Sequence, residues 1–593
     1  MNKFHFQFPR FFLLIFPLLL ALGTQAFAKQ QLYGHIPRAV TTSPKIGSLP
    51  DNTLVHFSLD LPWRDPEGLD VLLRELYDPH NPLYRKFLSP DQFTMRFGPT
   101  QADYQAVIAF AKANGLQVES TYPNRLMVDV AGTVADIRRV LHVNLHQYSH
   151  PEGGTFYAPD AEPSLDLDIP LQHVTGLDNF ARPKMKLHKF PQKTGGLSSN
   201  LVQKVGSKPV SGVGLYIGKD FRDAYVPDVP ASIKGAGQTV ALIEFDGFYA
   251  PDTAAYETAA TITAPVPITV LVNGFNGTPV NAGDTDEVSL DIEMVISMAP
   301  DAQVEVLEVN PNANADTSFN GMLQKLVQSP LCGQISCSWG GFGNNTSKSL
   351  LNQLAAQGQA YLEASGDNGA FVAGSPVSNV ADDPSLTLSD YETLVGGTIL
   401  TTNPPTTPTP GSPITYVSET TWNDHVGASG GGIASWPTPV HPSFTPMPIP
   451  TYQVPIPMTS NSGSTLWRNI PDVACVAATI YLVAENLGYK GPIWGTSAAS
   501  PLWAAYWALA NQEAANMGKG HIGNPNPPLY TLALSPTPYA NDFHDINDGS
   551  NNNWTFNGPY TVTAGYDLAT GWGSPKGQNL ITDLVAADTH PCG

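Results

Sequence analysis

The sequence predicts an α/β domain with a mostly parallel sheet flanked by helices, preceded by a smaller ferredoxin-like α+β domain. From residue 237 onward, apolar β-rich runs alternate with helical segments, as they do when helices cover a parallel sheet. Before residue 178, shorter strands and helices alternate on the scale of a small two-layer domain. The expected boundaries are 29–178 for the first domain, 179–212 for a linker and 213–593 for the second domain.

The first domain shows strand and helix signals in alternation, without a catalytic constellation. A helix is expected where apolar residues have helical spacing and end on Gly115, a residue typical of helix C-termini. The expected elements are helix Gln101–Asn114, strands Leu116–Ser120 and Arg125–Val130, helix Val134–Leu141 and a third strand Val143–Tyr148.

The second domain begins with Gln238–Phe245, an apolar run suited to a buried parallel strand. Further strands are expected at Val304–Val309, Gln334–Trp339 and Ala360–Ser365. Helices are expected at Glu287–Ala299, Ser318–Gln328, Ser349–Gln357 and Leu502–Asn511.

Charge and composition exclude several classes of protein. The 593 residues carry a net charge of −21, which is unsuited to general nucleic-acid binding. With 42% apolar residues, 52 glycines and 54 prolines, the chain is globular and rich in loops. We expect a monomer.

Residues 1–28 have the pattern of a signal peptide. Lys3 and Arg10 precede the apolar run Phe11–Leu22, and residues 26–28 (Ala-Phe-Ala) fit a cleavage site. No other stretch approaches the roughly 20 apolar residues that a membrane span needs. We therefore expect a secreted protein, extracellular or periplasmic, without membrane attachment.

Residues 179–212 differ in composition from both domains, because basic residues lie there among glycine, serine and glutamine. We interpret the segment as a solvated linker and, since linkers are preferred sites of proteolysis, as the place of a maturation cleavage. The basic residues are Arg182, Lys184, Lys186, Lys189, Lys193, Lys204 and Lys208. Export permits disulfides, and Cys332 with Cys337 is the first candidate pair.

The stretch Gly491 to Pro501 (GPIWGTSAASP) carries the first candidate for chemistry. Gly495 permits a sharp turn, and Pro501 suits the first turn of the apolar helix that follows. Ser497 then lies at a helix N-terminus, where free N–H groups favour the oxyanion that a serine nucleophile forms. The alternative is a serine that only caps the helix.

Three carboxyl groups are candidates for the remaining roles. Glu287 and Asp291 are four residues apart on one helix face, where mutual repulsion raises the pKa of at least one and suits a general base. Asp367 follows an expected strand at the edge of the sheet where active sites of α/β folds collect. The alternatives are an acidic first helix turn for the pair and a simple turn for Asp367.

The ordered set of these motifs resembles the sedolisin (serine-carboxyl peptidase) family. The set consists of Glu287 with Asp291, Ser365-Gly366-Asp367, Ser429 to Gly432, and Gly495-Thr496-Ser497. Supporting segments are Ile243 to Phe245, Ser336 to Gly341, Arg468 to Val473 and Thr570 to Gly573. The first domain, notably Pro82 to Pro90, resembles the family's activation prodomain. The resemblance implies a subtilisin-like fold made as a zymogen, with the prodomain as intramolecular inhibitor.

The resemblance also implies a role for each candidate. Ser497 would be the nucleophile and Glu287 the general base, with Asp291 hydrogen-bonded behind it. Asp367 would serve the oxyanion hole, which requires a protonated carboxyl and hence acid conditions. Glu244 and Trp339 match outer members of the same network.

A calcium site is implied near the C-terminus. Two carboxylates with intervening backbone carbonyls suit a hard cation that prefers oxygen ligands. The resemblance implies one Ca²⁺, bound by the side chains of Asp545 and Asp567 and by the carbonyls of Ile546, Thr563 and Gly565. The alternative is an Asp-rich turn.

The expected activity is acid endopeptidase cleavage of protein or peptide substrates. A tripeptidyl-peptidase of the same family would share the chemistry but need a free substrate N-terminus. A non-catalytic secreted binding protein on a peptidase scaffold is a further alternative, although Ser497, Glu287, Asp291 and Asp367 are all intact. An esterase would need a well-placed histidine, and the sequence offers none.

Overall fold

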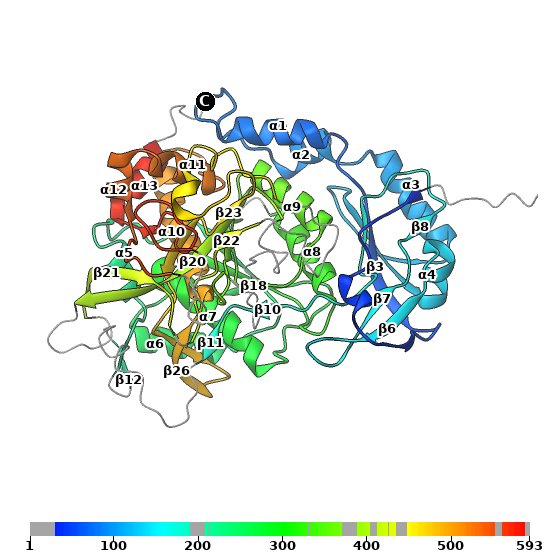
Figure 1. Ribbon diagram of the computed structural model, residues 1–593, viewed down its shortest axis with the longest axis horizontal. Coiled ribbons are helices and arrows are strands. Elements are labelled where there is room, and N and C mark those ends of the chain that lie inside the picture. Colours follow the sequence, from blue (N-terminus) through cyan, green and yellow to red (C-terminus); the bar gives the residue numbers. More distant parts are fainter. Residues whose placement is uncertain are drawn as a thin grey trace, which may run out of the picture.

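The computed structural model describes residues 30–189, 208–210, 213–329, 332–370, 388–403, 412–424, 426–434, 447–551 and 560–586. The predicted signal peptide, residues 1–28, lies outside the described residues, and so do Cys592 and much of the predicted linker. The first domain (blue to cyan) lies beside the larger domain (green to red), and helices α1 (Pro66–Leu76) and α2 (Pro90–Phe97) extend over the larger domain (Figure 1).

The first domain contains the predicted ferredoxin-like sheet. Its strands are β3 (Leu54–Asp60), β4 (Gln117–Thr121), β5 (Met127–Thr133) and β9 (His173–Thr175). They lie in the order β4-β5-β3-β9, and all neighbours are antiparallel. Helices α3 (Gln101–Ala113) and α4 (Val134–Leu141) share an apolar core with this sheet. Their N-termini are set by Thr100 and Thr133, whose side chains accept hydrogen bonds from N–H groups of the first turn.

The predicted strand Val143–Tyr148 exists but belongs to a different sheet. It is β6 (Leu145–Ser149), which pairs with β2 (Lys45–Ser48) and β7 (Thr155–Pro159). Strand β9 closes the main sheet instead. Local strand signals could not distinguish these partners, because pairing is decided between segments far apart in the sequence.

The larger domain is built on the predicted, mostly parallel sheet. Neighbouring strands are parallel except for β20 and β21, which are antiparallel. The strands, in spatial order, are β15 (Ile268–Leu271), β16 (Gln303–Glu308), β14 (Thr239–Glu244), β17 (Cys332–Cys337), β19 (Ala360–Ala364), β20 (Glu392–Asn403) and β21 (Thr415–Thr421), with β24 (Val473–Val476) also paired to β20.

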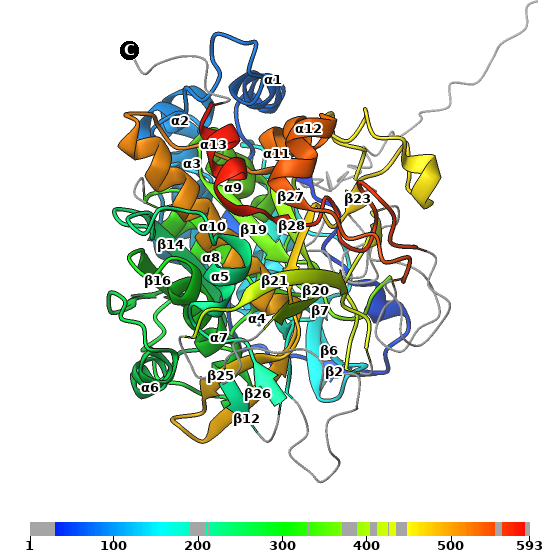
Figure 2. The ribbon, with the colours of Figure 1, turned by 90° about the vertical axis from the view of Figure 1, so that its left-hand side faces the viewer.

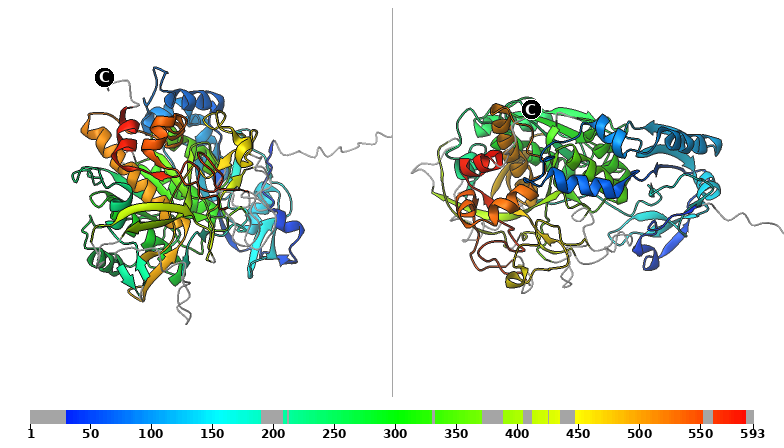
Figure 3. Two further views of the ribbon diagram at one scale, coloured as in Figure 1. Left: turned by 60° about the vertical axis from the view of Figure 1, so that its left-hand side comes forward. Right: turned by 90° about the horizontal axis from the view of Figure 1, so that it is seen from above.

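Helices cover both faces of this sheet. Alternate residues of β14 point to opposite faces: Val240 and Leu242 join the core formed with α7 (Ala282–Met298) and α10 (Thr496–Asn516). Ala241 and Ile243 join the core formed with α8 (Ala315–Leu326) and α9 (Asn345–Ala356). The same second core includes apolar residues of α1 and α2, so the first domain packs on this side (Figures 2 and 3).

The remaining elements complete the two domains. The hairpin of β25 (Ile480–Ala484) and β26 (Tyr489–Trp494) leads into α10. The other helices are α5 (Asp220–Tyr225), α6 (Ala250–Ala260), α11 (Asn526–Ala533), α12 (Pro536–Asp542) and α13 (Gly577–Ala586). Short paired strands are β1 (Gln30–Gln31) with β8 (Ser164–Leu165), β12 (Lys208–Val210) with β13 (Val213–Leu215), β22 (Gly432–Ile433) with β23 (Asn469–Ile470), and β27 (Phe543–His544) with β28 (Ser574–Pro575). No helix in the described part of the chain has the length and apolar character that crossing a bilayer requires.

Two sequence-based expectations were wrong. Helix α10 begins at Thr496, so Pro501 lies inside the helix and not in its first turn. The candidate disulfide does not form: Cys332 and Cys337 are free, buried thiols at opposite ends of strand β17. An extended strand of this length holds its ends far beyond the reach of a disulfide.

Candidate active site

The predicted catalytic residues come together where several strands of the central sheet end. Strand β14 ends at Glu244, β17 is followed directly by Ser338, and Asp367 lies three residues after β19. Helix α7 brings Glu287 and Asp291 to the same place, and α10 begins there with Ser497 in its first turn. Parallel strands deliver their carboxyl ends to one edge, which explains the convergence.

Ser497 is fully buried beneath neighbouring segments of the chain. Its hydroxyl lies 3.5 Å from the carbonyl oxygen of Ser338, too long for a strong hydrogen bond. Pro501 has no N–H to donate to the Ser497 carbonyl, and the hydroxyl of Ser338 lies 3.2 Å from that carbonyl oxygen instead. Ser338 therefore stabilises a helix start that proline would otherwise leave incomplete.

Glu287 is the carboxyl next to Ser497. Burial raises its pKa well above the usual value, and the charges of Asp291 and Asp367 raise it further. The adjacent Ser497 side chain acts in the opposite direction. Neither carboxylate oxygen of Glu287 has a hydrogen-bond partner of normal geometry among the described residues. Glu287 is thus a buried carboxyl whose position favours taking up a proton.

Asp291 and Glu244 form a group of three neighbouring carboxyls with Glu287. Burial raises the pKa of both well above the usual values, and the charge of Asp291 raises that of Glu244 further. Trp339 donates a hydrogen bond of 2.9 Å from its indole N–H to Glu244, and the Ser338 hydroxyl lies 2.8 Å from Oδ1 of Asp291. Such closely spaced carboxyls share protons, so they titrate as one system.

Asp367 lies at the start of α10, beside Thr496, the residue that precedes Ser497. Its Oδ1 accepts hydrogen bonds from the backbone N–H (2.9 Å) and hydroxyl (2.7 Å) of Thr496. Burial raises the pKa of Asp367 to about 6, although the nearby charge of His188 lowers it. Oδ2 of Asp367 has no hydrogen-bond partner in the described structure and lies 3.4 Å from Nε2 of His188.

The Ser429–Gly432 motif supports the loop that carries Asp367. Ser365 donates its hydroxyl to the Gly430 carbonyl at 2.7 Å, and the Gly430 N–H donates to the Gly366 carbonyl at 2.7 Å. A side chain at position 430 is excluded, because its Cβ would lie 2.1 Å from the carbonyl oxygen of Ser365.

The start of the predicted linker crosses this site as an extended strand. Residues Lys184–Met185 (β10) pair antiparallel with Trp339–Gly340 (β18), and His188–Lys189 (β11) pair antiparallel with the end of β26 (Figure 1). The prediction of a solvated linker is therefore wrong for these residues, since two sheet edges bind them. Composition alone could not reveal this, because strand addition uses mainly backbone hydrogen bonds.

The peptide bond between Lys186 and Leu187 lies directly against the start of α10. The Ser497 N–H donates to the Lys186 carbonyl at 3.2 Å, and the Lys186 N–H donates to the Ser338 carbonyl at 3.1 Å. Gly495, with φ of 152°, allows this approach: a Cβ there would lie 2.3 Å from the Lys186 carbonyl oxygen and 2.9 Å from Cα of Leu187. Sequence reasoning missed Ser338, Lys186 and His188 as members of the site.

The residues of the predicted calcium site also lie together. Asp545 accepts a hydrogen bond from the Gly565 N–H at 3.0 Å, and the buried Asp567 accepts one from the Thr563 N–H at 3.2 Å. Oδ1 of Asp567 accepts from the N–H groups of Ala569 and Thr570. Asp545 thus contacts the turn formed by residues 563–567, and Asp567, at the end of this turn, accepts a hydrogen bond from its first residue. No cluster of three or more His, Cys, Asp or Glu side chains suited to a metal occurs among the described residues, so any cation here needs backbone carbonyls as well.

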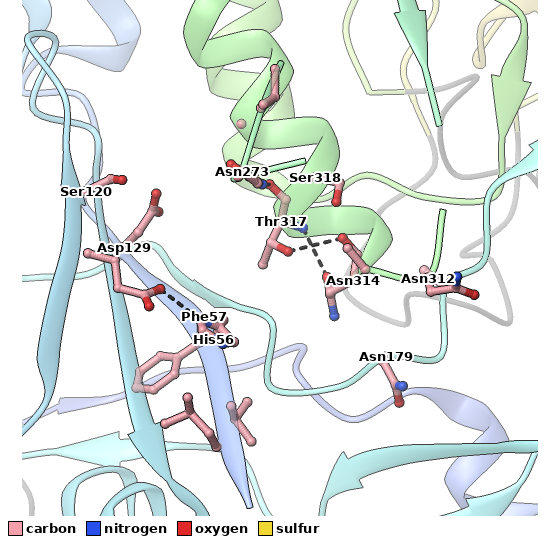
Figure 4. A pocket seen from close by; sticks show the side chains of 18 of the residues that line it. His56, Phe57, Ser120, Asp129, Asn179, Asn273, Asn312, Asn314, Thr317 and Ser318 are labelled. Carbon is pink, nitrogen blue, oxygen red and sulfur yellow. Dashed lines mark hydrogen bonds and ion pairs between the residues drawn. The ribbon is translucent and has the colours of Figure 1, made fainter. Parts of the chain in front are cut away.

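A pocket of about 1250 Å³ lies elsewhere, between the two domains. None of the four predicted catalytic residues lines it, and its surface mixes polar and apolar side chains (Figure 4). It therefore belongs to the contact between the domains and not to the catalytic site. Its labelled residues are His56, Phe57, Ser120 and Asp129 from the first domain, Asn179, and Asn273, Asn312, Asn314, Thr317 and Ser318 from the larger domain.

Comparison with known proteins finds similar proteins for both parts of the chain. Residues 41–180 match the activation domain of pro-kumamolisin. Kumamolisin of Bacillus sp. (strain MN-32) is 29% identical over 525 residues, covering 85% of this chain and 87% of that protein. A tripeptidyl-peptidase of Aspergillus fumigatus is 26% identical over 594 residues, covering 89% of this chain and 92% of that protein.

A solved structure of Pseudomonas sedolisin, a serine-carboxyl proteinase complexed with two molecules of pseudo-iodotyrostatin, aligns with a TM-score of 0.49 and 23% identity, covering 65% of this chain and 97% of that one. The match to the activation domain and the relatives that align with both domains point to one family. Over most of its length the chain is similar to peptidases of the sedolisin family, and its residues 41–180 match an activation domain found in precursors of that family.

Proposed function

We propose that this chain is the secreted zymogen of an acid-acting serine-carboxyl endopeptidase. The observation that carries the proposal is the position of the Lys186–Leu187 peptide bond. Its carbonyl accepts the Ser497 N–H, while Glu287 lies next to the Ser497 side chain and Asp367 binds the adjacent Thr496. This is how a peptide substrate must lie for a serine to attack it.

Ser497 would act as the nucleophile in acyl transfer. Its oxygen forms a bond to the substrate carbonyl carbon while its proton passes to Glu287. The C–N bond then breaks, and Glu287 returns the proton to the leaving amine. Water hydrolyses the resulting ester by the same route, giving its proton to Glu287 and restoring Ser497. Asp291 and Glu244, behind Glu287, would position it and share its proton.

Asp367 would stabilise the oxyanion together with the Ser497 N–H. Only a protonated carboxyl can donate a hydrogen bond to an oxyanion, because an ionised carboxylate only accepts. The pKa of Asp367, about 6, makes the protonated form the main one in acid. This supports an enzyme that works in acid and loses activity as Asp367 ionises.

The path of the linker favours an endopeptidase over a tripeptidyl-peptidase. Counting back from the bond at Ser497, the third residue is Lys184, which pairs with Gly340. The chain continues beyond it, and the Arg182 carbonyl lies where a Cβ of Gly341 would be only 2.7 Å away. The cleft is thus open past the third position, where an enzyme that releases tripeptides must bind a free amino terminus.

The first domain would act as the enzyme's intramolecular inhibitor. Its continuation fills the cleft, and α1 and α2 share a core with α9 of the larger domain. Removal of the first domain would therefore be required before a protein substrate can bind. A signal peptide at residues 1–28 would place these steps outside the cytoplasm.

Asp545, Asp567 and the carbonyls of Ile546, Thr563 and Gly565 would hold one Ca²⁺. The residues fit such an ion, because Asp567 is fully buried and makes no ion pair with a lysine, arginine or histidine among the described residues. A bound cation would neutralise this carboxylate and hold the 545–567 loop in place. Calcium would supply structural support and no catalytic chemistry.

The proposal is tested by incubating the purified full chain with a denatured protein from about pH 2 to about pH 8, beside Ser497→Ala. We expect cleavage in acid only, accompanied by loss of the first domain and absent from the variant. Internally quenched peptides with blocked N-termini separate the two activities, since only an endopeptidase cleaves them. No cleavage at any pH would favour a non-catalytic binding protein.

A further inference from the structure

We infer that Glu363 makes the substrate pocket beside Ser497 a lysine pocket, so that the enzyme cleaves after lysine and makes its first self-cleavage between Lys186 and Leu187. This inference rests on the proposed peptidase function. It concerns the substrate preference, which can be disproved by experiment even if the chain is shown to be a peptidase.

The backbone defines which residue occupies the pocket. Lys186 supplies the carbonyl bound by the Ser497 N–H, and its own N–H donates to the Ser338 carbonyl. It is therefore the residue on the acyl side of the bond facing Ser497. Residues on both sides of it are held by strand pairing, with β18 before and β26 after. A shift by one residue would break both pairings.

The Lys186 side chain is buried in the protein with its charge paired. Its Nζ donates to Oε1 of Glu363 at 2.9 Å and to the Ala364 carbonyl at 2.8 Å. The side chains are only 6% and 1% exposed, respectively, for Lys186 and Glu363. A buried ammonium requires such partners, because an unpaired charge inside a protein is very costly.

Glu363 is part of the larger domain, so it remains in place after the linker has been cleaved and released. It lies on β19, four residues before Asp367, and Tyr361 on the same strand donates its hydroxyl to Oε2 of Glu363 at 3.1 Å. The hydroxyl leaves Oε1 directed to the ammonium. A substrate lysine entering the vacated pocket would regain both hydrogen bonds, whereas an apolar side chain has no donor for Oε1 of Glu363 or for the Ala364 carbonyl.

The neighbouring linker lysines are bound differently. Lys184 is 60% exposed and pairs with Glu152 of the first domain. Lys189 is 29% exposed and contacts Asp286 and Glu485 at the edge of the cleft. Among residues 179–189 of the linker, Lys186 is buried while Lys184 and Lys189 are partly exposed, so burial and not the basic composition identifies Lys186.

The self-cleavage follows the proposed chemistry. Ser497 Oγ bonds to the Lys186 carbonyl carbon, the bond from that carbon to the Leu187 nitrogen breaks, and the serine proton reaches the new Leu187 amine through Glu287. Water then releases Lys186 as a free carboxyl terminus. Leu187 becomes the first residue of the processed chain.

The test uses quenched peptides with blocked N-termini that differ only at the residue before the scissile bond: Lys, Arg, Gln or Leu. We expect the activated full chain to prefer Lys over Gln by about 100-fold in kcat/KM, with Arg between them. Glu363→Gln should reduce this preference to below about tenfold by lowering kcat/KM for the Lys peptide. Glu485→Gln, which removes a carboxyl at the rim of the cleft, should keep the full preference.

Three further measurements keep the test decisive if Glu363→Gln misfolds. Glu363→Asp should retain a measurable lysine preference, and N-terminal sequencing of the wild-type product should begin at Leu187. Lys186→Gln should slow the first cut, while Lys184→Gln should not. Equal cleavage after Lys, Gln and Leu by the wild type, or a first cut elsewhere, would overturn the inference. A wild type that cleaves none of the peptides would instead overturn the proposed function.

Discussion

Two buried carboxyls, one where the domains meet and one beside Ser497, are held in opposite ways. Asp60 accepts hydrogen bonds from the hydroxyls of Ser58 and Thr175 at 2.6 Å, and from Thr346 of the larger domain at 2.7 Å. Glu287 is equally buried, yet neither of its oxygens has a partner of normal geometry among the described residues. The two carboxyls are equally buried, but they differ in the number of hydrogen bonds that they accept from the described residues.

The difference separates carboxyls that hold the structure from carboxyls available for chemistry. Burial raises the pKa of Asp60 only to about 6, because three hydroxyls counteract it. For Glu287 the neighbouring charges of Asp291 and Asp367 add to burial, and the pKa rises well above its usual value. A catalytic group must exchange protons during the reaction, which a fully hydrogen-bonded carboxylate resists. Four predictions test this distinction.

The largest effect is expected from changes at Ser497 and at Glu287. Ser497→Ala and Glu287→Gln should each lower kcat/KM by about 10⁴-fold or more, because the nucleophile or its base is lost. Glu287→Gln should not lower the midpoint of thermal unfolding at pH 7, since it removes a repelled carboxylate. Measured activity within tenfold of the wild type would end the assignment of Glu287 as base.

Asp367 should control the pH at which activity is lost. In the precursor, where the charges of His188 and Lys186 act against burial, its pKa lies at about 6, so the group is protonated and able to donate below that pH and ionised above it. Activity should therefore be present in acid and fall as pH rises through about 6. Asp367→Ala should lose about 10² to 10³-fold in kcat, as oxyanion-hole variants do.

Asp367→Asn provides the matched control for the pH effect. The amide donates a hydrogen bond at every pH, so its residual activity should no longer fall near pH 6. A wild-type profile that the amide variant reproduces without change would contradict the role of Asp367.

Asp60 should affect stability and not catalysis. Asp60→Ala leaves three buried hydroxyls without their acceptor and should cost about 2–4 kcal/mol in the free energy of unfolding. It should also hasten release of the first domain, because the Thr346 bond crosses between domains. Denaturant unfolding in the Ser497→Ala background measures the loss without self-cleavage. The processed enzyme should keep its kcat, and a large drop in kcat would contradict the distinction.

The effect expected at Asp567 depends on the calcium concentration. It is buried like Asp60 but surrounded by N–H donors, and we propose that calcium completes its environment. Chelation should lower the unfolding midpoint by several degrees, equivalent to about 3 kcal/mol where calcium was in 100-fold excess over Kd. Asp567→Asn should abolish the response to chelator. An unchanged midpoint in strong chelator would remove the calcium site from the proposal.

Much of the architecture followed from local signals in the chain. Thr133 and the apolar spacing behind it predicted helix Val134–Leu141 with both ends correct, because capping and periodicity act within a few residues. The partner of β6 and the position of Pro501 inside α10 were not predictable in this way. They depend on Ser338 and on strands distant in sequence, which no local window contains.

The sequence by itself determined the fold class, the order of the motifs and the four residues proposed for catalysis, because each motif has its own turn, strand or helix start. Only the tertiary structure decided which linker residue lies at Ser497 and which carboxyl receives its side chain. Lys186 and Glu363 are 177 residues apart. Every residue of β19 is buried, so no periodicity marks the direction in which Glu363 points. That choice arises from strand pairing and from the cost of burying an unpaired charge, both of which act between distant segments.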